Sequence, residues 1–378
     1  MINTTYYQDL TKMNTFGMKV KARCFMEYDS VADLVDIEFE ELARPVLHIG
    51  GGSNLLFTDD FKGTVLHSKI NFIEILEDGS DVLVSVGSGV VFDDFCAWAA
   101  KEGLWGVENL SYIPGEVGAS AVQNIGAYGV EVKDVIRTVY CYDTVEEEFV
   151  KFDVEECEYG YRDSVFKDPE VKGRYVVTHV VFALSRTPQP RLDYGHLRDA
   201  VMASSVSLSS DPRPATSSLT HPLAGGGMSL PSDTEEAMMS RLTPALIRRV
   251  IIKIRKEKLP EPSVMGSAGS FFKNPVITAE HFARMEAAAK AELGSDYKVP
   301  HYDLPDGTVK VPAAWMIEQC GWKGRRSGGA AVYDKQPLVI VNYTGDAYPE
   351  EIVGLERRII ASVKAKFDID LHPEVEHV

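Results

Sequence analysis

Residues 114–129 read P-G-E-V-G-A-S-A-V-Q-N-I-G-A-Y-G, with four glycines, three alanines and a serine in sixteen positions and almost no charge. Glycine costs backbone entropy inside a helix or a strand, so this run is a poor interior for either element. It is typical of backbone that passes very close to a large group and presents peptide N–H groups to a phosphate or a ring. The run therefore predicts a glycine-rich turn that contacts a ligand.

A second run of small residues, I-G-G-G-S-N-L-L-F, lies upstream at 49–57. It directly follows the apolar segment 45–49, which predicts a short strand. A glycine-rich turn after a strand is a known cradle for phosphate, and two such turns indicate a dinucleotide with two phosphates. The alternative that both runs are merely tight turns stays open, because a single glycine cluster is weak evidence.

The composition is that of an ordinary globular protein. The chain has 378 residues, of which 45% are apolar and 25% charged, enough for two or three domains. Its net charge of −17 argues against a nucleic-acid-binding protein, whose binding face is basic. Anion binding stays open, because such a site needs only a few local cations.

The five cysteines are scattered without a C-x-x-C pair, which indicates reduced thiols rather than a disulfide framework or a zinc site. The first residues do not match a signal peptide, and no apolar run is long enough to span a bilayer. We therefore expect a soluble, cytoplasmic protein with no membrane or metal partner. We further expect a monomer that binds a small molecule and no nucleic acid, although nothing in the sequence fixes the oligomeric state.

Hydrophobic periodicity predicts alternating strands and helices. Alternation over 81–90 predicts a half-buried strand, and the helical spacing that follows over 92–99 predicts a helix ended by Gly103. A further strand is predicted at 175–184. A helix is predicted from the capping Thr243 and first-turn Pro244 to Leu259-Pro260, and a last helix at 349–367.

Serine, proline, threonine and glycine dominate residues 204–239. Such a segment cannot bury enough apolar surface to become ordered. We therefore predict a low-complexity insertion that forms a mobile surface loop.

Three polar residues lie in segments that predict chemistry. Arg162 stands between aromatic and acidic neighbours, Ser270 is surrounded by small residues, and Glu374 lies in the tail. Each has an ordinary alternative. Arg162 could pair with Asp163 on the surface, Ser270 could cap a helix or a turn, and Glu374 could be an exposed carboxylate. Their combination with two phosphate-type turns favours a functional site.

Seven short sequence blocks, taken together, make the chain resemble the UDP-N-acetylenolpyruvoylglucosamine reductase family of peptidoglycan synthesis. The blocks occur in the family's order along nearly the whole chain, and only 204–239 lacks a recognisable counterpart. They are N-T-F-G (14–17), I-G-G-G-S-N-L-L-F (49–57), the run at 114–129, E-Y-G-Y-R-D-S-V-F-K (158–167), K-L-P-E-P (258–262), G-S-A-G-S-F-F-K-N-P (266–275) and P-E-V (373–375).

The resemblance implies an α+β protein with an FAD-binding fold of the vanillyl-alcohol-oxidase type and a C-terminal α/β substrate-binding domain. The two FAD-binding subdomains are expected at 1–67, joined by the tail 368–378, and at 68–247, and the substrate-binding domain at 248–367. FAD is expected along the two glycine-rich turns. The residues expected to bind it are Gly50, Gly51, Gly52, Ser53, Asn54, Pro114, Gly115, Gly118, Ala119, Ser120, Gln123, Asn124, Gly126, Ala127 and Tyr128.

The reaction that the resemblance implies is the NADPH-dependent reduction of UDP-N-acetylglucosamine enolpyruvate to UDP-N-acetylmuramate. It implies that hydride passes from NADPH to flavin N5 and then to substrate C3, while Ser270 protonates C2. Arg162 is expected to pair with the substrate carboxylate and the developing enolate charge, with Glu374 completing the site.

Further substrate contacts are implied by matching motif positions. D-Y-G-H-L, residues 193–197, looks like the tyrosine loop of one family subtype, which is expected to fold Tyr194 over the uridine or the diphosphate. The expected substrate-binding residues are Tyr161, Tyr194, Lys258, Asn274 and Gln319, with Arg255 a weaker candidate. Two positions depart from the family pattern. Ala121 stands where many relatives carry proline, and Glu376 stands where some carry arginine.

Two other functions remain as alternatives, a flavin oxidase of the same fold and a binding or sensor module that kept the nucleotide-sugar pocket. The S-F-F-K-N arrangement from Ser270 to Asn274 favours enolpyruvyl chemistry over an oxidase. A pure binding module has no need of Arg162, Ser270 and Glu374 together.

Overall fold

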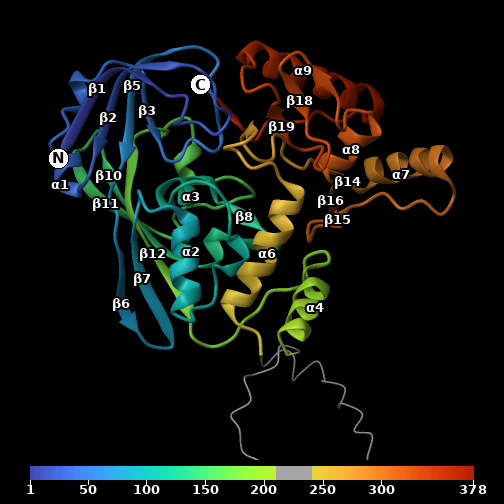
Figure 1. The fold of residues 1–378 in the computed structure, drawn as a ribbon, viewed down its shortest axis with the longest axis horizontal. Helices are drawn as coiled ribbons and strands as arrows, with labels where there is room; N and C mark the ends of the chain where they lie inside the picture. The colour runs from blue at the N-terminus through green and yellow to red at the C-terminus, as the bar shows by residue number, and fades with distance from the viewer. Residues whose placement is uncertain (210–240) are drawn as a thin grey trace, which may run out of the picture.

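The computed structural model describes residues 1–209 and 241–378, which fall into three parts (Figure 1). The N-terminal part is a mixed sheet in the order β1-β2-β5-β3, in which β1 pairs antiparallel with β2 and β5 lies parallel to β2 and β3. Strand β3 confirms the strand predicted at 45–49. The elements are β1 (Ile2–Asp9), β2 (Lys21–Tyr28), α1 (Val31–Val35), η1 (Phe39–Glu41), β3 (Val46–Ile49), β4 (Leu55–Leu56) and β5 (Phe61–Ser68).

The middle part is an antiparallel sheet in the order β11-β10-β12-β7-β6. Helix α3 contacts β7 and β12, and α6 packs against α2 and α4. The elements are β6 (Ile73–Asp78), β7 (Asp81–Gly87), α2 (Phe92–Lys101), η2 (Glu108–Leu110), α3 (Val117–Gln123), β8 (Gly126–Ala127), β9 (Val130–Glu131), η3 (Val132–Asp134), β10 (Ile136–Asp143), β11 (Glu148–Asp153), η4 (Val165–Lys167), β12 (Tyr175–Ser185), α4 (Leu197–Ser209) and α6 (Pro244–Lys258).

The C-terminal part contains two antiparallel sheets, β13-β19-β18-β17 and β14-β16-β15, and α9 packs on β18 and β19. The predicted last helix at 349–367 is confirmed as α9. The elements are β13 (Gly266–Ser267), β14 (Val276–Thr278), α7 (Ala279–Leu293), β15 (Tyr302–Asp303), β16 (Thr308–Lys310), α8 (Ala313–Gln319), β17 (Arg326–Ser327), β18 (Ala330–Val332), β19 (Ile340–Asn342), α9 (Pro349–Phe367) and β20 (Glu376–His377).

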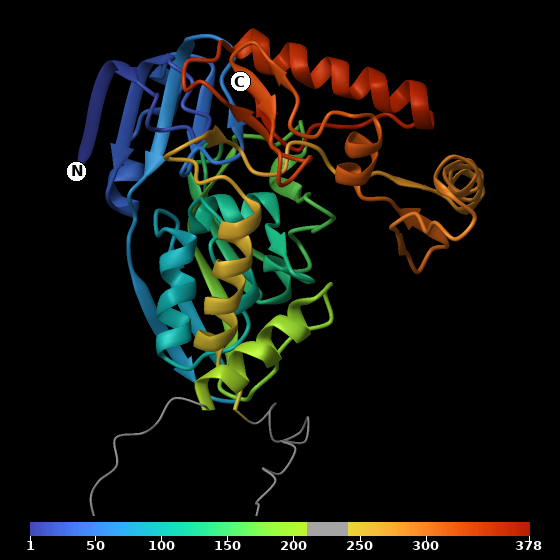
Figure 2. The same ribbon diagram turned by 45° about the vertical axis from the view of Figure 1, so that its right-hand side comes forward.

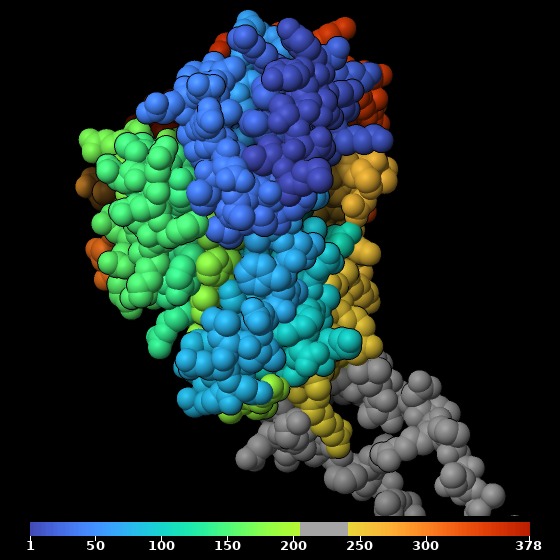
Figure 3. All heavy atoms as spheres, turned by 90° about the vertical axis from the view of Figure 1, so that its left-hand side faces the viewer, coloured from blue at the N-terminus to red at the C-terminus, as the bar shows by residue number. Residues whose placement is uncertain are grey.

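One hydrophobic core lies within the middle part, and a second core joins the N-terminal and C-terminal parts. The alternating valines of β7 are buried with Phe95 of α2 and Phe182 of β12, whose ring centroids are 4.7 Å apart, and this confirms the predicted strands and the helix between them. The N-terminal and C-terminal parts share a second core, in which the rings of Phe16 and Phe271 meet at 6.1 Å. Figure 2 accordingly shows the C-terminal part (orange to red) beside the N-terminal sheet (blue) at the top of the molecule. In Figure 3 the N-terminal residues (dark blue) lie directly above residues of β6 and β7 (light blue).

The C-terminal tail returns from α9 to the first glycine-rich run. Strand β20 pairs in parallel with β4, in the register Glu376↔Leu55. The amide of Val378 donates to Leu56 O at 2.9 Å, and the amide of Thr58 donates to Val378 O at 2.7 Å. The tail thereby carries Glu374 to the edge of the turn at 50–54.

The structure corrects the prediction for 114–129. Seven of these residues form α3, and Asn124 ends the helix in the left-handed conformation with φ of 44°. A Cβ on Gly118 would lie 2.9 Å from the Cβ of Ser88. The small residues therefore serve to bring a short helix very close to the sheet, and the entropic cost of glycine does not prevent it from forming.

Helix α4 corrects the start of the predicted loop at 204–239, because it extends to Ser209. Its first turns bury Leu197 and Val201 against α6, and the Ser204 hydroxyl donates to Ala200 O at 2.9 Å, so this serine is accommodated within the helix. The rest of the predicted loop, residues 210–239, lies outside the described residues. Helix α6, predicted from its Thr243 cap, is confirmed, and it runs across the expected domain boundary at 247/248.

Candidate active site

A cavity of about 1270 Å³ lies where the three parts meet. Its wall includes both glycine-rich runs, the segment around Arg162, the loop of Ser270 and the tail. Pockets for single small ligands are typically ~300–1,000 Å³, so this cavity has room for a large cofactor beside a substrate.

The two glycine-rich runs face each other in this wall. The Ser53 hydroxyl donates to Pro114 O at 3.0 Å, and a Cβ on Gly51 would lie 3.3 Å from the Cα of Gly115. At Gly52, φ is +60° and a Cβ would lie 2.0 Å from Met13 O. Backbone thus packs against backbone: a side chain at Gly51 would push against the second run, and one at Gly52 would collide with the backbone of Met13.

All of the residues expected to bind FAD line the cavity except Asn124. Its side chain is fully buried and donates to Glu131 Oε2 at 3.1 Å and to Gly160 O at 2.8 Å. Its Oδ1 accepts the amide of Lys133 at 3.3 Å. Asn124 therefore stabilises the β8–β9 hairpin through hydrogen bonds on the side away from the cavity, because its left-handed backbone turns the side chain away from the wall.

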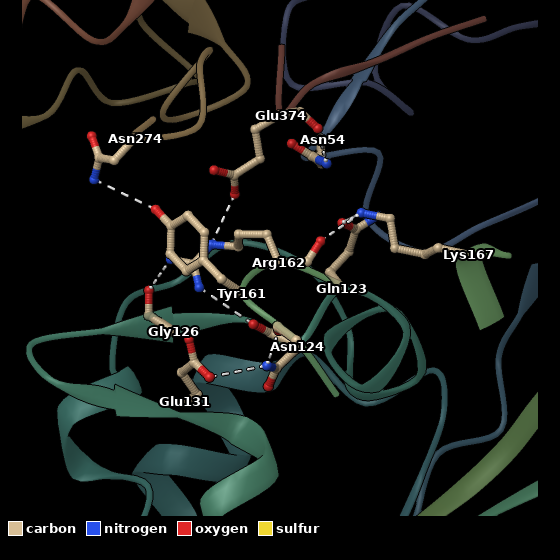
Figure 4. Close-up of polar contacts among 11 residues, drawn as sticks. Asn54, Gln123, Asn124, Gly126, Glu131, Tyr161, Arg162, Lys167, Asn274 and Glu374 are labelled. Atoms are coloured by element: carbon tan, nitrogen blue, oxygen red, sulfur yellow. Dashed lines mark hydrogen bonds and ion pairs between the residues drawn. The ribbon is translucent and has the colours of Figure 1, made fainter. Parts of the chain in front are cut away.

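Arg162 is held by three acceptors from distant segments (Figure 4). Its Nε donates to Glu374 Oε1 at 3.0 Å, while its terminal nitrogens donate to Asn124 O at 3.3 Å and to Gly126 O at 2.7 Å. Its own backbone has φ of 57°, an uncommon value for a residue other than glycine. Arg162 is therefore a fixed internal group, and the alternative of a surface pair with Asp163 is wrong.

Glu374 is the largely buried partner of Arg162, with 16% of its side chain exposed. Burial raises the pKa of Glu374, although the charges of Arg162, Lys167 and Lys273 act in the opposite direction. The Glu374 amide donates to Phe271 O, and its carbonyl accepts from Asn54 Nδ2 at 3.1 Å. The alternative of an exposed terminal carboxylate is therefore wrong.

Lys167, which the sequence analysis did not single out, supports Arg162 from behind. Its ammonium donates to Arg162 O at 2.9 Å and to Gln123 Oε1 at 3.1 Å, as Figure 4 shows. Burial lowers the pKa of Lys167. Its position at the end of the E-Y-G-Y-R-D-S-V-F-K block was the signal that could have identified it.

Ser270 lies in the loop between β13 and β14 and lines the same cavity as Arg162 and Glu374. The two residues that follow it, Phe271 and Phe272, are almost completely buried and anchor the loop. Within the described residues, the Ser270 hydroxyl has no hydrogen-bond partner, so it caps neither a helix nor a turn and is available to a ligand.

Four of the five residues expected to bind the nucleotide-sugar line the cavity, namely Tyr161, Tyr194, Lys258 and Asn274. Gln319 does not. It is the last residue of α8, where its carbonyl accepts from Lys366 Nζ at 3.3 Å, so it belongs to the contact between α8 and the end of α9. Asn274 is partly committed already, because its Oδ1 accepts the Ala313 amide at 2.9 Å and its Nδ2 lies 3.5 Å from Tyr161 Oη.

An aromatic and cationic cluster that the sequence analysis missed joins the middle and C-terminal parts across the cavity. The ring of Tyr194 stacks on Tyr302 with centroids 6.4 Å apart and meets Tyr128 edge-on at 6.0 Å. Lys310 Nζ lies 4.9 Å from the ring centroid of Tyr161 and 5.6 Å from that of Tyr302. Only the folded chain brings these residues together, since they come from four separate segments.

Cations gather in the cavity despite the net charge of −17. Arg162, Lys167, Lys172, Arg255, Lys258 and Lys310 all line it. Arg255 donates through Nε to Tyr112 O at 3.1 Å, and burial lowers its pKa.

Lys172 pairs with Glu376, one of the two positions that depart from the family pattern. The other, Ala121, is fully buried in α3.

Within residues 1–209 and 241–378, no group of three or more His, Cys, Asp or Glu side chains is arranged to hold a metal ion. In that same part of the chain, no helix combines the length and the apolar character needed to cross a membrane.

Comparison with known proteins identifies relatives along the whole chain. Residues 23–149 match the model of an FAD binding domain, and residues 261–378 match that of the UDP-N-acetylenolpyruvoylglucosamine reductase C-terminal domain. The chain is 46% identical over 371 residues to the UDP-N-acetylenolpyruvoylglucosamine reductase of Bacteroides fragilis, covering 98% of each chain. It is 41% identical over 375 residues to that of Porphyromonas gingivalis, covering 98% of this chain and 97% of the relative.

A solved structure shows the same fold. The crystal structure of UDP-N-acetylenolpyruvylglucosamine reductase from Thermus caldophilus matches with a TM-score of 0.61 at 20% identity, covering 100% of this chain and 98% of that chain. The predicted α+β class with an FAD-binding domain is therefore confirmed.

Proposed function

Because the chain belongs to the UDP-N-acetylenolpyruvoylglucosamine reductase family, we propose that it reduces UDP-N-acetylglucosamine enolpyruvate to UDP-N-acetylmuramate in peptidoglycan precursor synthesis. FAD is the proposed cofactor and NADPH the proposed source of electrons. The observation that carries the proposal is the meeting of Arg162, Glu374 and Ser270 in one cavity with the two glycine-rich runs.

The cavity fits FAD on two counts. The runs 50–54 and 114–120 approach each other closely through glycine backbone, as at Gly51 and Gly115, and the volume exceeds that of a single-ligand pocket. These runs, with 123–128 apart from the buried Asn124, would hold the cofactor. When bound, FAD supplies the two-electron chemistry, accepting hydride from NADPH and delivering it to C3 of the enolpyruvyl group.

We propose the division of labour expected from the family, with FAD-binding subdomains at 1–67 plus 368–378 and at 68–247, and a substrate-binding domain at 248–367. The pairing of β20 with β4 supports assigning the tail to the first subdomain. Helix α6 packs on α2 and α4, so its residues beyond 247 also belong structurally to the second.

Arg162 is the proposed partner of the substrate carboxylate. A guanidinium has five N–H donors, and three of them are used by Glu374, Asn124 O and Gly126 O, which leaves two for a ligand. Because those three acceptors fix the guanidinium before substrate arrives, no reorganisation of Arg162 is needed when negative charge develops on the enolate.

Ser270 is the proposed proton donor to C2. A serine hydroxyl is a weak acid, so it can serve only where the accepting carbon is strongly basic and well positioned. Its freedom from protein hydrogen bonds supports this role. Glu374 is proposed to hold Arg162 through its carboxylate and the Ser270 loop through its amide, which binds Phe271 O.

The nucleotide-sugar is proposed to lie toward Lys258, Tyr194 and the Tyr302–Lys310 side of the cavity. A diphosphate needs cations, which Lys258 and Lys310 supply, and the ring faces of the tyrosines suit stacking on the base of the uridine.

An anaerobic flavin titration tests the proposed function. Purified protein should be yellow, its flavin absorbance should bleach on addition of NADPH, and it should return on addition of the enolpyruvyl sugar. Bleaching without return would contradict the proposal and favour an oxidase with another substrate. Colourless protein that still binds the UDP-sugar would favour a binding or sensor module.

A further inference from the structure

A buried histidine lies between two glutamates behind the wall of the cavity. His67, on β5, is 4% exposed. Its Nδ1 lies 3.0 Å from Glu27 Oε1 on β2, and its Nε2 lies 3.0 Å from Glu116 Oε1 in the second glycine-rich run. The three residues come from separate segments, so the tertiary fold assembles this group. The proposed reaction makes no use of it.

The geometry of this group determines its protonation. A neutral imidazole has one N–H donor and one acceptor nitrogen, whereas an ionised carboxylate only accepts hydrogen bonds. With a carboxylate at each ring nitrogen, both nitrogens of His67 have to carry hydrogen, and the ring is then an imidazolium ion. A neutral ring would set a nitrogen lone pair against a carboxylate oxygen at 3.0 Å.

The surrounding charges favour the same state. Burial acts to lower the pKa of His67, but the bonds to Glu116 and Glu27 and the charge of Glu116 outweigh burial and raise it above the usual 6.5. Lys69 is the charged neighbour that opposes this increase. Tyr28, on β2, also faces Glu116, and burial raises the pKa of its hydroxyl, so it stays neutral.

Glu116 itself belongs to the cavity wall. It directly follows Gly115, and a Cβ on Gly50 would lie 3.3 Å from Glu116 Oε2, so the carboxylate stands between the two glycine-rich runs. A negative charge here, next to the backbone proposed to hold a diphosphate, would repel that ligand in a medium of low dielectric constant. A neighbouring positive charge offsets this repulsion.

We propose that His67 is a positioning residue for the cofactor, which holds Glu116 against the wall of the cavity and offsets its negative charge so that the phosphate-bearing FAD can bind. The proposal rests on the proposed function only for the identity of the cofactor. It follows that FAD affinity declines as the pH rises and His67 loses its proton, and that removing His67 is harmful chiefly because Glu116 remains.

The test compares FAD release from the full-length holoenzyme on dilution, followed by flavin fluorescence, from about pH 6 to about pH 9. We expect His67→Gln to weaken FAD binding about tenfold or more at neutral pH. We expect the double variant His67→Gln/Glu116→Gln to recover to within about threefold of wild type, because the unpaired carboxylate is gone. Glu116→Gln alone should bind FAD with little dependence on pH. His281→Gln, at a histidine that contacts Phe367 O and does not line the cavity, is the control.

Three results would overturn this proposal. They are wild-type affinity in His67→Gln, weaker binding in Glu116→Gln than in His67→Gln, and an unchanged pH dependence in Glu116→Gln. The last decides the question even where His67→Gln does not fold. A wild-type protein that binds no FAD at any pH would instead contradict the proposed function.

Discussion

Arg162 Nε donates to Glu374 Oε1 at 3.0 Å, although the two residues are 212 positions apart in the chain. The contact exists only because the tail returns to pair with β4 and Glu374 binds Phe271 O on the way. Only 18% of the Arg162 side chain and 16% of that of Glu374 are exposed, so removing either partner leaves a largely buried charge alone. The proposed site is thus closed by the segment 373–378, which follows α9.

Arg162→Lys should greatly lower the rate of the second half-reaction, in which the reduced flavin passes hydride to the enolpyruvyl sugar. The first half-reaction is the reduction of the flavin by NADPH. A lysine ammonium cannot reach the three acceptors and still offer a planar pair of donors, so we expect turnover of the enolpyruvyl sugar to decrease by about 10²–10³-fold. Flavin reduction by NADPH should change little. Anaerobic stopped-flow absorbance separates the two steps. Arg186→Lys, at an exposed pair with Asp78, is the control, and full activity of Arg162→Lys would remove Arg162 from the site.

Glu374→Gln should change the pH profile as well as the rate. Because burial raises the pKa of Glu374 above its usual 4.5, the wild-type ion pair with Arg162 is lost on acidification at a higher pH than for an exposed glutamate. We expect the second half-reaction of the wild type to decline as the pH decreases through that raised pKa. In the glutamine variant the second half-reaction should be slower by on the order of tenfold, and its rate should not show this decline at acid pH, the acid limb of the profile. An identical acid limb in both proteins would assign it to another group.

Ser270→Ala should leave flavin reduction by NADPH nearly intact and slow the second half-reaction by about 10²–10⁴-fold, the usual contribution of a positioned proton donor. Since the hydroxyl has no protein partner in the described residues, its loss should not alter the thermal midpoint of unfolding. Ser295→Ala, on an exposed turn, is the control. Parallel losses in both half-reactions would indicate a structural role for Ser270.

The sequence identified the site segments because each is local and distinctive. The blocks around Arg162, Ser270 and Glu374 are short, and the structure brings all three to one cavity. Periodicity likewise located β7, α2, α6 and α9, because apolar spacing records which face of an element is buried. The residues alone left Arg162 free to pair with Asp163, and only the family resemblance placed Glu374 near it, since the contact depends on how the tail returns.

Where the sequence misled, packing overrode local preference. The glycines and alanines of 114–129 indicated a turn, yet α3 forms because those small residues let a helix lie close to Ser88. Serines from 204 onward indicated a loop, yet α4 continues to Ser209. The Tyr302–Lys310 cluster and the His67 group escaped notice because neither leaves a pattern within a single segment.

The tail should also make stability depend on pH. His377 Nε2 lies 3.1 Å from the buried Glu356 Oε2, and this pairing raises the pKa of His377 above 6.5. The stabilisation is therefore complete below the unfolded pKa and is lost as the pH rises through the folded pKa. We expect His377→Gln to lower the thermal midpoint at about pH 5.5 and to match wild type near about pH 9. A deficit that does not change with pH would contradict this, and His301→Gln is the control.

Gly52→Ala should destabilise the protein more than Gly17→Ala, although both glycines adopt a left-handed backbone. Their φ values are +60° and +67°, so each alanine incurs a similar backbone strain of roughly 1–2 kcal/mol. Around Gly17 nothing lies within 4 Å of a new Cβ, whereas at Gly52 that atom would lie 2.0 Å from Met13 O, which is backbone and cannot rotate away. We therefore expect urea unfolding to show a further loss of about 1–3 kcal/mol for Gly52→Ala. Equal losses in the two variants would mean that the first glycine-rich run tolerates displacement, and its close packing would then not be what shapes the cavity wall.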